Sequence, residues 1–118
     1  MIGLKRVYEP SSPDDGTRVL VDRLWPRGVS KSKAAVDVWL KEVAPSPDLR
    51  KWFSHEDAKW DEFRERYWKE LEANPANVQK LKDMADKGKI TLIFSTRDEV
   101  RNSAAILRDF LTRSDESG

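Results

Sequence analysis

Two short segments of the chain concentrate the side chains that could bind an anion. The first is DRLWPRG at residues 22–28, and the second is STRDEVRN at residues 95–102. Arginine presents a planar set of N–H donors that matches carboxylate and phosphate oxygens, so arginines brought together would form an anion site. The two segments supply eight candidate ligand-binding residues: Arg23, Arg27, Arg97, Asn102, Asp22, Asp98, Trp25 and Ser95.

The same residues also fit a purely structural role. Asp22 and Asp98 are natural partners for the arginines, and a network of Asp–Arg pairs would hold two loops together without any ligand. Trp25 follows an apolar segment, where a large aromatic side chain more often covers the core than supports a ligand. The residues alone leave both interpretations open.

No reaction is indicated by the sequence. If the chain is an enzyme, the arginines would stabilise developing negative charge, and Asp22 or Asp98 would be the nearby general bases. Cysteine is absent, and no glycine-rich phosphate loop or histidine-based triad can be assembled. The expected function is therefore binding of an anionic small molecule, a phosphorylated metabolite or a nucleotide, at an arginine-lined cleft. Catalysis is left open, and no cofactor is expected.

A metal site is not expected either. His55 is the one histidine, and Glu56 and Asp57 follow it directly. Consecutive residues at the start of a helix point in different directions, and carboxylates are favoured there by the helix dipole alone.

Turn residues and apolar periodicity predict three strands and several helices. The strands are expected at Ile2–Tyr8, Thr17–Leu24 and Lys89–Phe94. A helix is expected over Ser30–Ala44, followed by a single helical turn at 49–53. Three further helices are predicted from the residues at their ends. The first begins at a capping box formed by Ser54 and Asp57. The second begins at Asn74 and Pro75 and ends at a cap at Gly88, and the third begins at a capping box formed by Thr96 and Glu99. Their core-facing stripes are Trp60, Phe63, Tyr67 and Leu71 in the first, Val78, Leu81, Met84 and Ala85 in the second, and Val100, Ala104, Leu107 and Leu111 in the third.

This order of elements predicts a single α/β domain with a small, mostly parallel sheet of about three strands and helices packed on it. The second and third strands are separated by helices and can be parallel neighbours. Their carboxyl ends would then share the edge of the sheet at which open α/β sheets bind ligands, and the two charged segments would meet there. The first two strands are joined too closely for a helical crossover, so any pairing between them is expected to be antiparallel.

Composition limits the classes of partner. The 118 residues carry 22 basic and 21 acidic side chains, a net charge of +1, so binding to duplex nucleic acid is not expected. No apolar run approaches the length of a membrane span, and the cytoplasm is the expected location by elimination. A protein partner is possible: in the alternative function, an aromatic surface at Trp39, Trp52 and Trp68 docks a protein and the arginines form structural ion pairs. Exposure of these tryptophans would favour a partner, and an open arginine-lined cleft would favour a ligand.

The chain resembles the YeaO-like family of uncharacterised bacterial domains. Four blocks carry the resemblance in the same order and spacing: KRVYEPSSPDDGTRVLVDRLWPRGVSK, WLKEVAPSPDLRKWF, FRERYWKEL, and ITLIFSTRD followed by RN. It implies a small cytosolic α/β protein with no established activity, with one domain over residues 1–113 and a frayed tail over 114–118. The positions that it marks are Asp22, Arg23, Trp25, Arg27, Trp52, Phe53 and Asn102. Many members have a histidine where this chain has Arg101, which argues against a histidine acid–base role at that position.

Overall fold

Four parallel strands and five helices make up the described part of the chain, which is residues 1–54 and 56–116 of a computed structural model. The strands are β1 (Ile2–Arg6), β2 (Thr17–Leu20), β3 (Val38–Trp39) and β4 (Ile90–Phe94). The helices are α1 (Lys31–Ala34), α2 (Pro47–Phe53), α3 (Trp60–Glu72), α4 (Pro75–Lys87) and α5 (Ser103–Glu116). The predicted α/β class is confirmed.

The sheet has the strand order β1-β4-β2-β3, so β4 and β2 are its central strands. Their parallel pairing is confirmed, with Val19 opposite Leu92. The antiparallel pairing considered for the first two strands does not arise, because β1 does not pair with β2 but runs parallel to β4, on its other side. An extended chain spans about 3.3 Å per residue, so the segment 7–16 can return alongside these short strands without a crossover helix.

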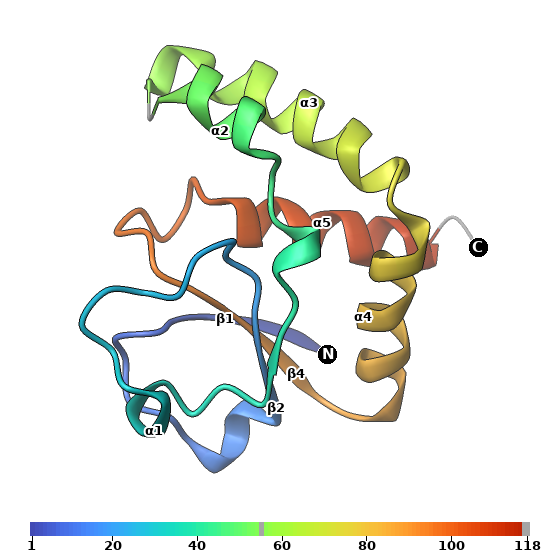
Figure 1. The fold of residues 1–118 in the computed structure, drawn as a ribbon. Coiled ribbons are helices and arrows are strands. Elements are labelled where there is room, and N and C mark those ends of the chain that lie inside the picture. The colour runs from blue at the N-terminus through green and yellow to red at the C-terminus, as the bar shows by residue number, and fades with distance from the viewer. Residues whose placement is uncertain (55, 117–118) are drawn as a thin grey trace.

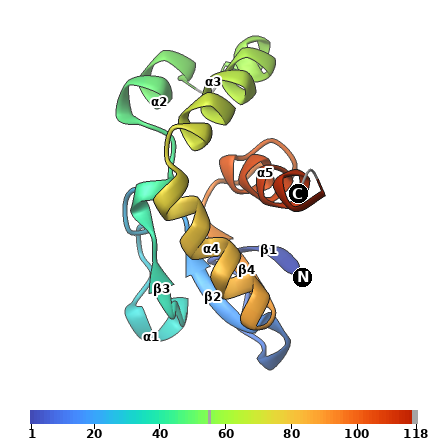
Figure 2. The same cartoon turned by 90° about the vertical axis from the view of Figure 1, so that its right-hand side faces the viewer.

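Alternate residues of the two central strands face two separate cores. Val19 and Leu92 belong to the larger core, which α3, α4 and α5 cover, whereas Leu20 and Ile93 pack against Ala34 of α1 on the opposite face. Figure 1 shows α4 and α5 beside the sheet and α1 at its lower end. Figure 2 shows α1 and β3 on the side away from α5. Burial on both faces explains why the two central strands are nearly continuous apolar runs.

The helix expected over Ser30–Ala44 is replaced by the short α1, the edge strand β3 and a 3-10 turn at Lys41–Val43. Helix α1 ends at Ala35, whose backbone is left-handed (φ 49°). The chain then pairs with β2. At the start of this pairing the backbone N–H of Asp37 donates to the carbonyl of Arg18, and the backbone N–H of Arg18 donates to the side-chain carboxylate of Asp37. Pairing with the exposed edge of β2 therefore outweighs the local helical periodicity.

Both predicted capping boxes were wrong. Ser54 ends α2 in the left-handed conformation (φ 46°) and donates its hydroxyl to the carbonyl of Lys51, so it does not begin a helix. The next helix, α3, begins at Trp60 after a 3-10 turn. At the other site, Thr96 and Glu99 lie in a loop and α5 begins only at Ser103, which leaves Val100 exposed. His55 lies outside the described residues.

The two long central helices follow the predicted pattern. In α3, Phe63, Tyr67 and Leu71 are buried and Trp60 packs against the same core. In α4, which Asn74 precedes and Pro75 opens, Val78 and Leu81 are buried while Met84 and Ala85 are half-buried. Gly88 follows α4, but its backbone is extended rather than left-handed. In α5, Ala104, Leu107 and Leu111 are buried as expected.

A buried ion-pair network closes the amino-terminal end of the sheet. The guanidinium of Arg18 lies 2.6 Å from Asp15 and donates further hydrogen bonds to the carbonyls of Ala34 and Ala35. Lys5 lies 2.9 Å from the other oxygen of the same carboxylate. Burial alone would raise the pKa of Asp15, but the hydrogen bonds from Lys5, the Ser12 backbone and Arg18 outweigh it and hold that pKa at about 2.

Helix α5 continues to Glu116, so it enters the segment 114–118 that was expected to fray, and residues 117 and 118 lie outside the described part. Among the described helices, none is long and apolar enough to span a membrane.

Candidate functional site

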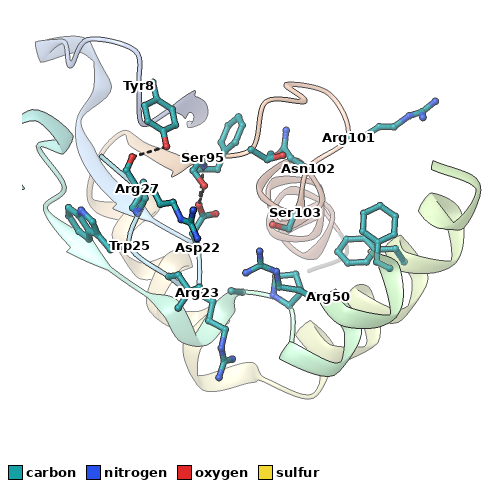
Figure 3. A pocket seen from close by; sticks show the side chains of 18 of the residues that line it. Tyr8, Asp22, Arg23, Trp25, Arg27, Arg50, Ser95, Arg101, Asn102 and Ser103 are labelled. Carbon is teal, nitrogen blue, oxygen red and sulfur yellow. Dashed lines mark hydrogen bonds between the residues drawn. The ribbon is translucent and has the colours of Figure 1, made fainter. Parts of the chain in front are cut away.

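The two charged segments meet at a cavity of about 390 Å³ at the carboxyl ends of β2 and β4. Helix α2 and the first turn of α3 form its other side (Figure 3). Its volume lies in the range of roughly 300–1,000 Å³ that is typical of small-molecule sites. Six of the eight candidate residues line it: Asp22, Arg23, Trp25, Arg27, Ser95 and Asn102.

A single carboxylate holds the two loops together. Ser95 donates its backbone N–H (3.0 Å) and its hydroxyl (2.6 Å) to Oδ2 of Asp22. Burial raises the pKa of Asp22 above its usual value, although the hydrogen bonds from Ser95 and the charge of Arg50 act in the opposite direction. The expected Asp–Arg network is thus replaced at Asp22 by an Asp–Ser clamp.

Four arginines line the cavity: Arg23, Arg27, Arg50 and Arg101. In Figure 3, Arg27 extends toward Asp22 from one side and Arg50 from the other, while Arg23 and Arg101 extend away from the centre. Within the described residues, no carboxylate oxygen lies within 4 Å of the first three of these guanidinium groups. Arg101 lies 3.8 Å from Asp57, and both side chains are exposed, so this pair is weak. The cavity therefore has a cationic surplus.

Arg97 and Asp98 do not line the cavity, and both are exposed. The carboxylate of Asp98 accepts the backbone N–H groups of Val100 and Arg101, which lower its pKa. Asp98 therefore stabilises the loop to which it belongs rather than binding an arginine of the cavity. The arginine that lines the cavity in place of the expected Arg97 comes from α2, as Arg50.

Asn102 is buried and caps α5. Its side-chain oxygen accepts the N–H of Ala105, and its amide group donates to the carbonyl of Asp98. An Asn at this position satisfies a helix N–H that otherwise has no partner. Asn102 thus fixes the loop that carries Arg101 and places Ser103 beside the cavity.

Trp25 combines features of both roles considered for it, covering the core and supporting a ligand. It lines the cavity, but its indole N–H donates to the carbonyl of Val29 (2.8 Å), and its ring packs edge-on against Trp39 at 5.6 Å. Trp39 in turn donates to the backbone carbonyl of Asp22 (2.8 Å). The two tryptophans therefore brace the loop from which Arg23 and Arg27 project.

An aromatic wall faces the arginines across the cavity. We use this name for Phe53, Trp60 and Phe63, which all line the cavity. The rings of Trp60 and Phe63 are stacked with centroids 5.5 Å apart, and Phe53 lies 4.5 Å from Phe63. The wall makes one side of the cavity apolar and aromatic.

Arg50 and the aromatic wall were not predicted as site residues. Arg50 and Phe53 are three residues apart and share one face of α2, so a cation and an aromatic ring enter the cavity together. The three-residue spacing of Arg50 and Phe53 was the feature of the sequence that could have identified them as site residues. Trp60 and Phe63 were predicted to face the core, and Phe53 was marked by the family resemblance without a role. In the structure Phe63 is buried, and Phe53 and Trp60 pack on the core from half-buried positions.

The aromatic surface of the alternative function is not continuous. Trp52 and Trp68 are half-buried, and cationic side chains lie over both rings, with Arg66 at 4.3 Å from the Trp52 centroid. Trp39 is 39% exposed but lies on β3, next to Trp25. By the criterion of exposure, the arginine-lined cavity is the stronger candidate. Among the described residues, no group of three or more His, Cys, Asp or Glu side chains is placed to hold a metal ion.

Comparison with known proteins places the chain among relatives of nearly the same length. It is 44% identical over 110 residues to Uncharacterized protein YeaO of Escherichia coli (strain K12), covering 93% of this chain and 96% of the relative. It is 42% identical over 110 residues to uncharacterized proteins of Mycobacterium bovis and Mycobacterium tuberculosis (strain H37Rv), covering 93% of this chain and 92% of each relative. No solved structure matches it. A family described as "Inactive DUF488-N3 subclade" matches residues 1–117, and the chain belongs to this YeaO-like family.

Proposed function

We propose that the protein binds an anionic small molecule in the cavity at the carboxyl ends of β2 and β4, and that it acts by binding rather than by catalysis. The observation that carries this proposal is the pair Arg27 and Arg50. They extend toward one point from opposite sides, and neither has a carboxylate within 4 Å among the described residues. A concave site with unpaired cations concentrates anions from solution.

The contacts of the cavity favour binding over catalysis. The hydroxyl of Ser95 is hydrogen-bonded to a carboxylate, which is a weak base, and no histidine is among the described residues that line the cavity. The word "inactive" in the description of the family fits a binding role. The cytoplasm is the compartment that we expect for this function.

The proposal can be tested with inorganic phosphate and ribose 5-phosphate as probes, by calorimetric titration at constant ionic strength. Arg27→Ala and Arg50→Ala should each weaken binding by about 10-fold or more, since hydrogen bonds to charged groups contribute about 1.5–3 kcal/mol. Their thermal stability should change little, because neither guanidinium has a carboxylate partner within 4 Å among the described residues.

Arg97→Ala is the matched control, because it removes the same charge from an exposed position outside the cavity. It should bind both probes as the wild type does. An equal loss in Arg97→Ala would mean that the probes respond only to net charge, and the absence of binding at millimolar probe would also refute the proposal.

A further inference from the structure

We propose that the anion is the phosphate of a nucleoside monophosphate, whose base stacks on the aromatic wall and whose sugar hydroxyls bind Asp22. This inference rests on the proposed function and specifies its ligand. Three features of the cavity carry it: an aromatic surface, a cationic surplus and an unused carboxylate oxygen.

The aromatic surface is the wall of Phe53, Trp60 and Phe63, in which the rings of Trp60 and Phe63 lie nearly parallel (22°). Phe53 and Trp60 are only half-buried, so part of each ring borders the cavity. Phosphate alone, or a phosphorylated sugar, would leave this surface in contact with water. Aromatic side chains beside a cationic groove are the usual way in which proteins stack nucleobases.

The cationic surplus favours a phosphate monoester over a carboxylate. Arg27 and Arg50 present two cations to one point of the cavity, so that point suits more than one negative charge. A phosphate monoester carries about −1.5 to −2 at pH 7. Arg50 projects from the same face of α2 as Phe53, so a phosphate on Arg50 and Arg27 would leave the base within reach of the wall.

Asp22 supplies the third contact. Both hydrogen bonds from Ser95 go to Oδ2, and no hydrogen bond within the described residues uses Oδ1. A carboxylate in an anion site repels the ligand unless the ligand also has donors for it. Ribose hydroxyls are such donors, and an acidic residue beside a parallel sheet commonly accepts them. Inorganic phosphate has neither a base to stack on the aromatic wall nor sugar hydroxyls to donate to Asp22.

The ligand panel for the test is AMP, GMP, CMP, UMP, ribose 5-phosphate, adenosine and inorganic phosphate, with each dissociation constant measured by calorimetry on the whole chain. At least one nucleoside monophosphate should bind about 10-fold or more tightly than ribose 5-phosphate and than adenosine. This margin is expected because the nucleotide engages the arginines and the wall at the same time.

Trp60→Leu isolates the stacking contact. It should weaken nucleotide binding by about 5- to 100-fold and leave ribose 5-phosphate unchanged. Trp68→Leu is the matched control, since Trp68 is a half-buried tryptophan of the same helix that does not line the cavity. If Trp60→Leu does not fold by circular dichroism, Phe53→Leu gives the same comparison from α2.

The outcomes separate this inference from the proposed function. Equal affinity for AMP and ribose 5-phosphate, with no effect of Trp60→Leu, would overturn the nucleotide assignment and leave the anion site standing. Nucleotide binding that Arg27→Ala and Arg50→Ala do not weaken would overturn the anion site. Failure of every ligand to bind at millimolar concentration would overturn both.

Discussion

At the scale of single residues, burial makes the charged form of Asp22 less favourable. Burial raises its pKa, so the folded protein favours the protonated form more than the unfolded chain does. The contribution of Asp22 to stability is therefore greatest in acid and falls as pH rises through the folded-state pKa. A neutral side chain could also accept the hydrogen bonds from Ser95, so an ionisable group at this position is not required by those bonds.

Asp22→Asn tests this interpretation. The asparagine oxygen can still accept from Ser95, while the buried charge is removed. The variant should have a higher free energy of unfolding than the wild type at pH 7, and this difference should shrink as pH is lowered through the titration of Asp22. Urea denaturation across this pH range measures both effects. A difference that does not vary with pH would show that altered geometry, rather than charge, is responsible.

Asp15 has the opposite dependence on pH. Its pKa is held at about 2, below the usual 3.8, so its contribution to stability is present above about 3.8 and is lost as pH falls through about 2. Asp15→Ala should cost about 3–5 kcal/mol at pH 7, because it leaves Arg18 buried without its carboxylate. Asp14→Ala, at the exposed neighbouring position, should change stability by less than about 0.5 kcal/mol. Similar losses in the two variants would mean that the turn, not the ion pair, is being measured.

At the scale of elements, α3 links the core to the site. Phe63 is 4% exposed and contacts Phe53, Trp60 and Tyr67, so it is the buried member of the aromatic wall and supports the other two rings. Phe63→Ala should therefore cost about 3–5 kcal/mol in a denaturant melt. A small domain has about 5–15 kcal/mol of stability in total, so this loss is large. A loss near zero would contradict the packing of α3 and favour a protein partner at this face.

Helices and strands with long apolar patterns in the sequence were predicted correctly, whereas those that depend on tertiary contacts were not. The stripe from Phe63 to Leu71 and the apolar run of β4 are long, and both predictions were right. The region 30–44 has a short stripe, and its pairing with β2 is a tertiary contact that periodicity does not contain. The pattern at Ser54 is equally consistent with the end of one helix and the start of another, and the structure uses it as an end.

The candidate site was predicted in part for the same reason. Parallel pairing of β2 with β4 is enough to bring Asp22 and Ser95 together, and the sequence order implied that pairing. The position of Arg50 depends on how α2 and α3 pack over the edge of the sheet, which no local pattern specifies. Arg97 is only two residues from Ser95, but the loop that Asp98 and Asn102 organise leaves it outside the cavity.

At the scale of the whole molecule, the charges are balanced and locally mixed. The net charge is +1, and acidic side chains accompany the basic ones on α3, where Arg66 pairs with Glu62 and Arg64 with Asp109 of α5. The cationic surplus described above lies in a cavity that also contains Asp22. Such a site admits a small anion but does not present the extended row of cations that a duplex backbone requires.

We therefore expect no appreciable binding of random duplex DNA at physiological salt, with a dissociation constant weaker than about 100 μM, the weak limit of ordinary non-specific binding. Fluorescence anisotropy of a labelled duplex measures this directly, and a repeat at low salt shows whether any residual binding is electrostatic. Phosphate contacts dominate such affinity, and each contact adds to its dependence on salt. A micromolar dissociation constant that weakens steeply as salt is raised would contradict the prediction. Arg27→Ala and Arg50→Ala would then show whether the duplex uses the cavity, because loss of duplex binding in both would make a nucleic-acid strand, rather than a free nucleotide, the occupant of the arginine-lined site.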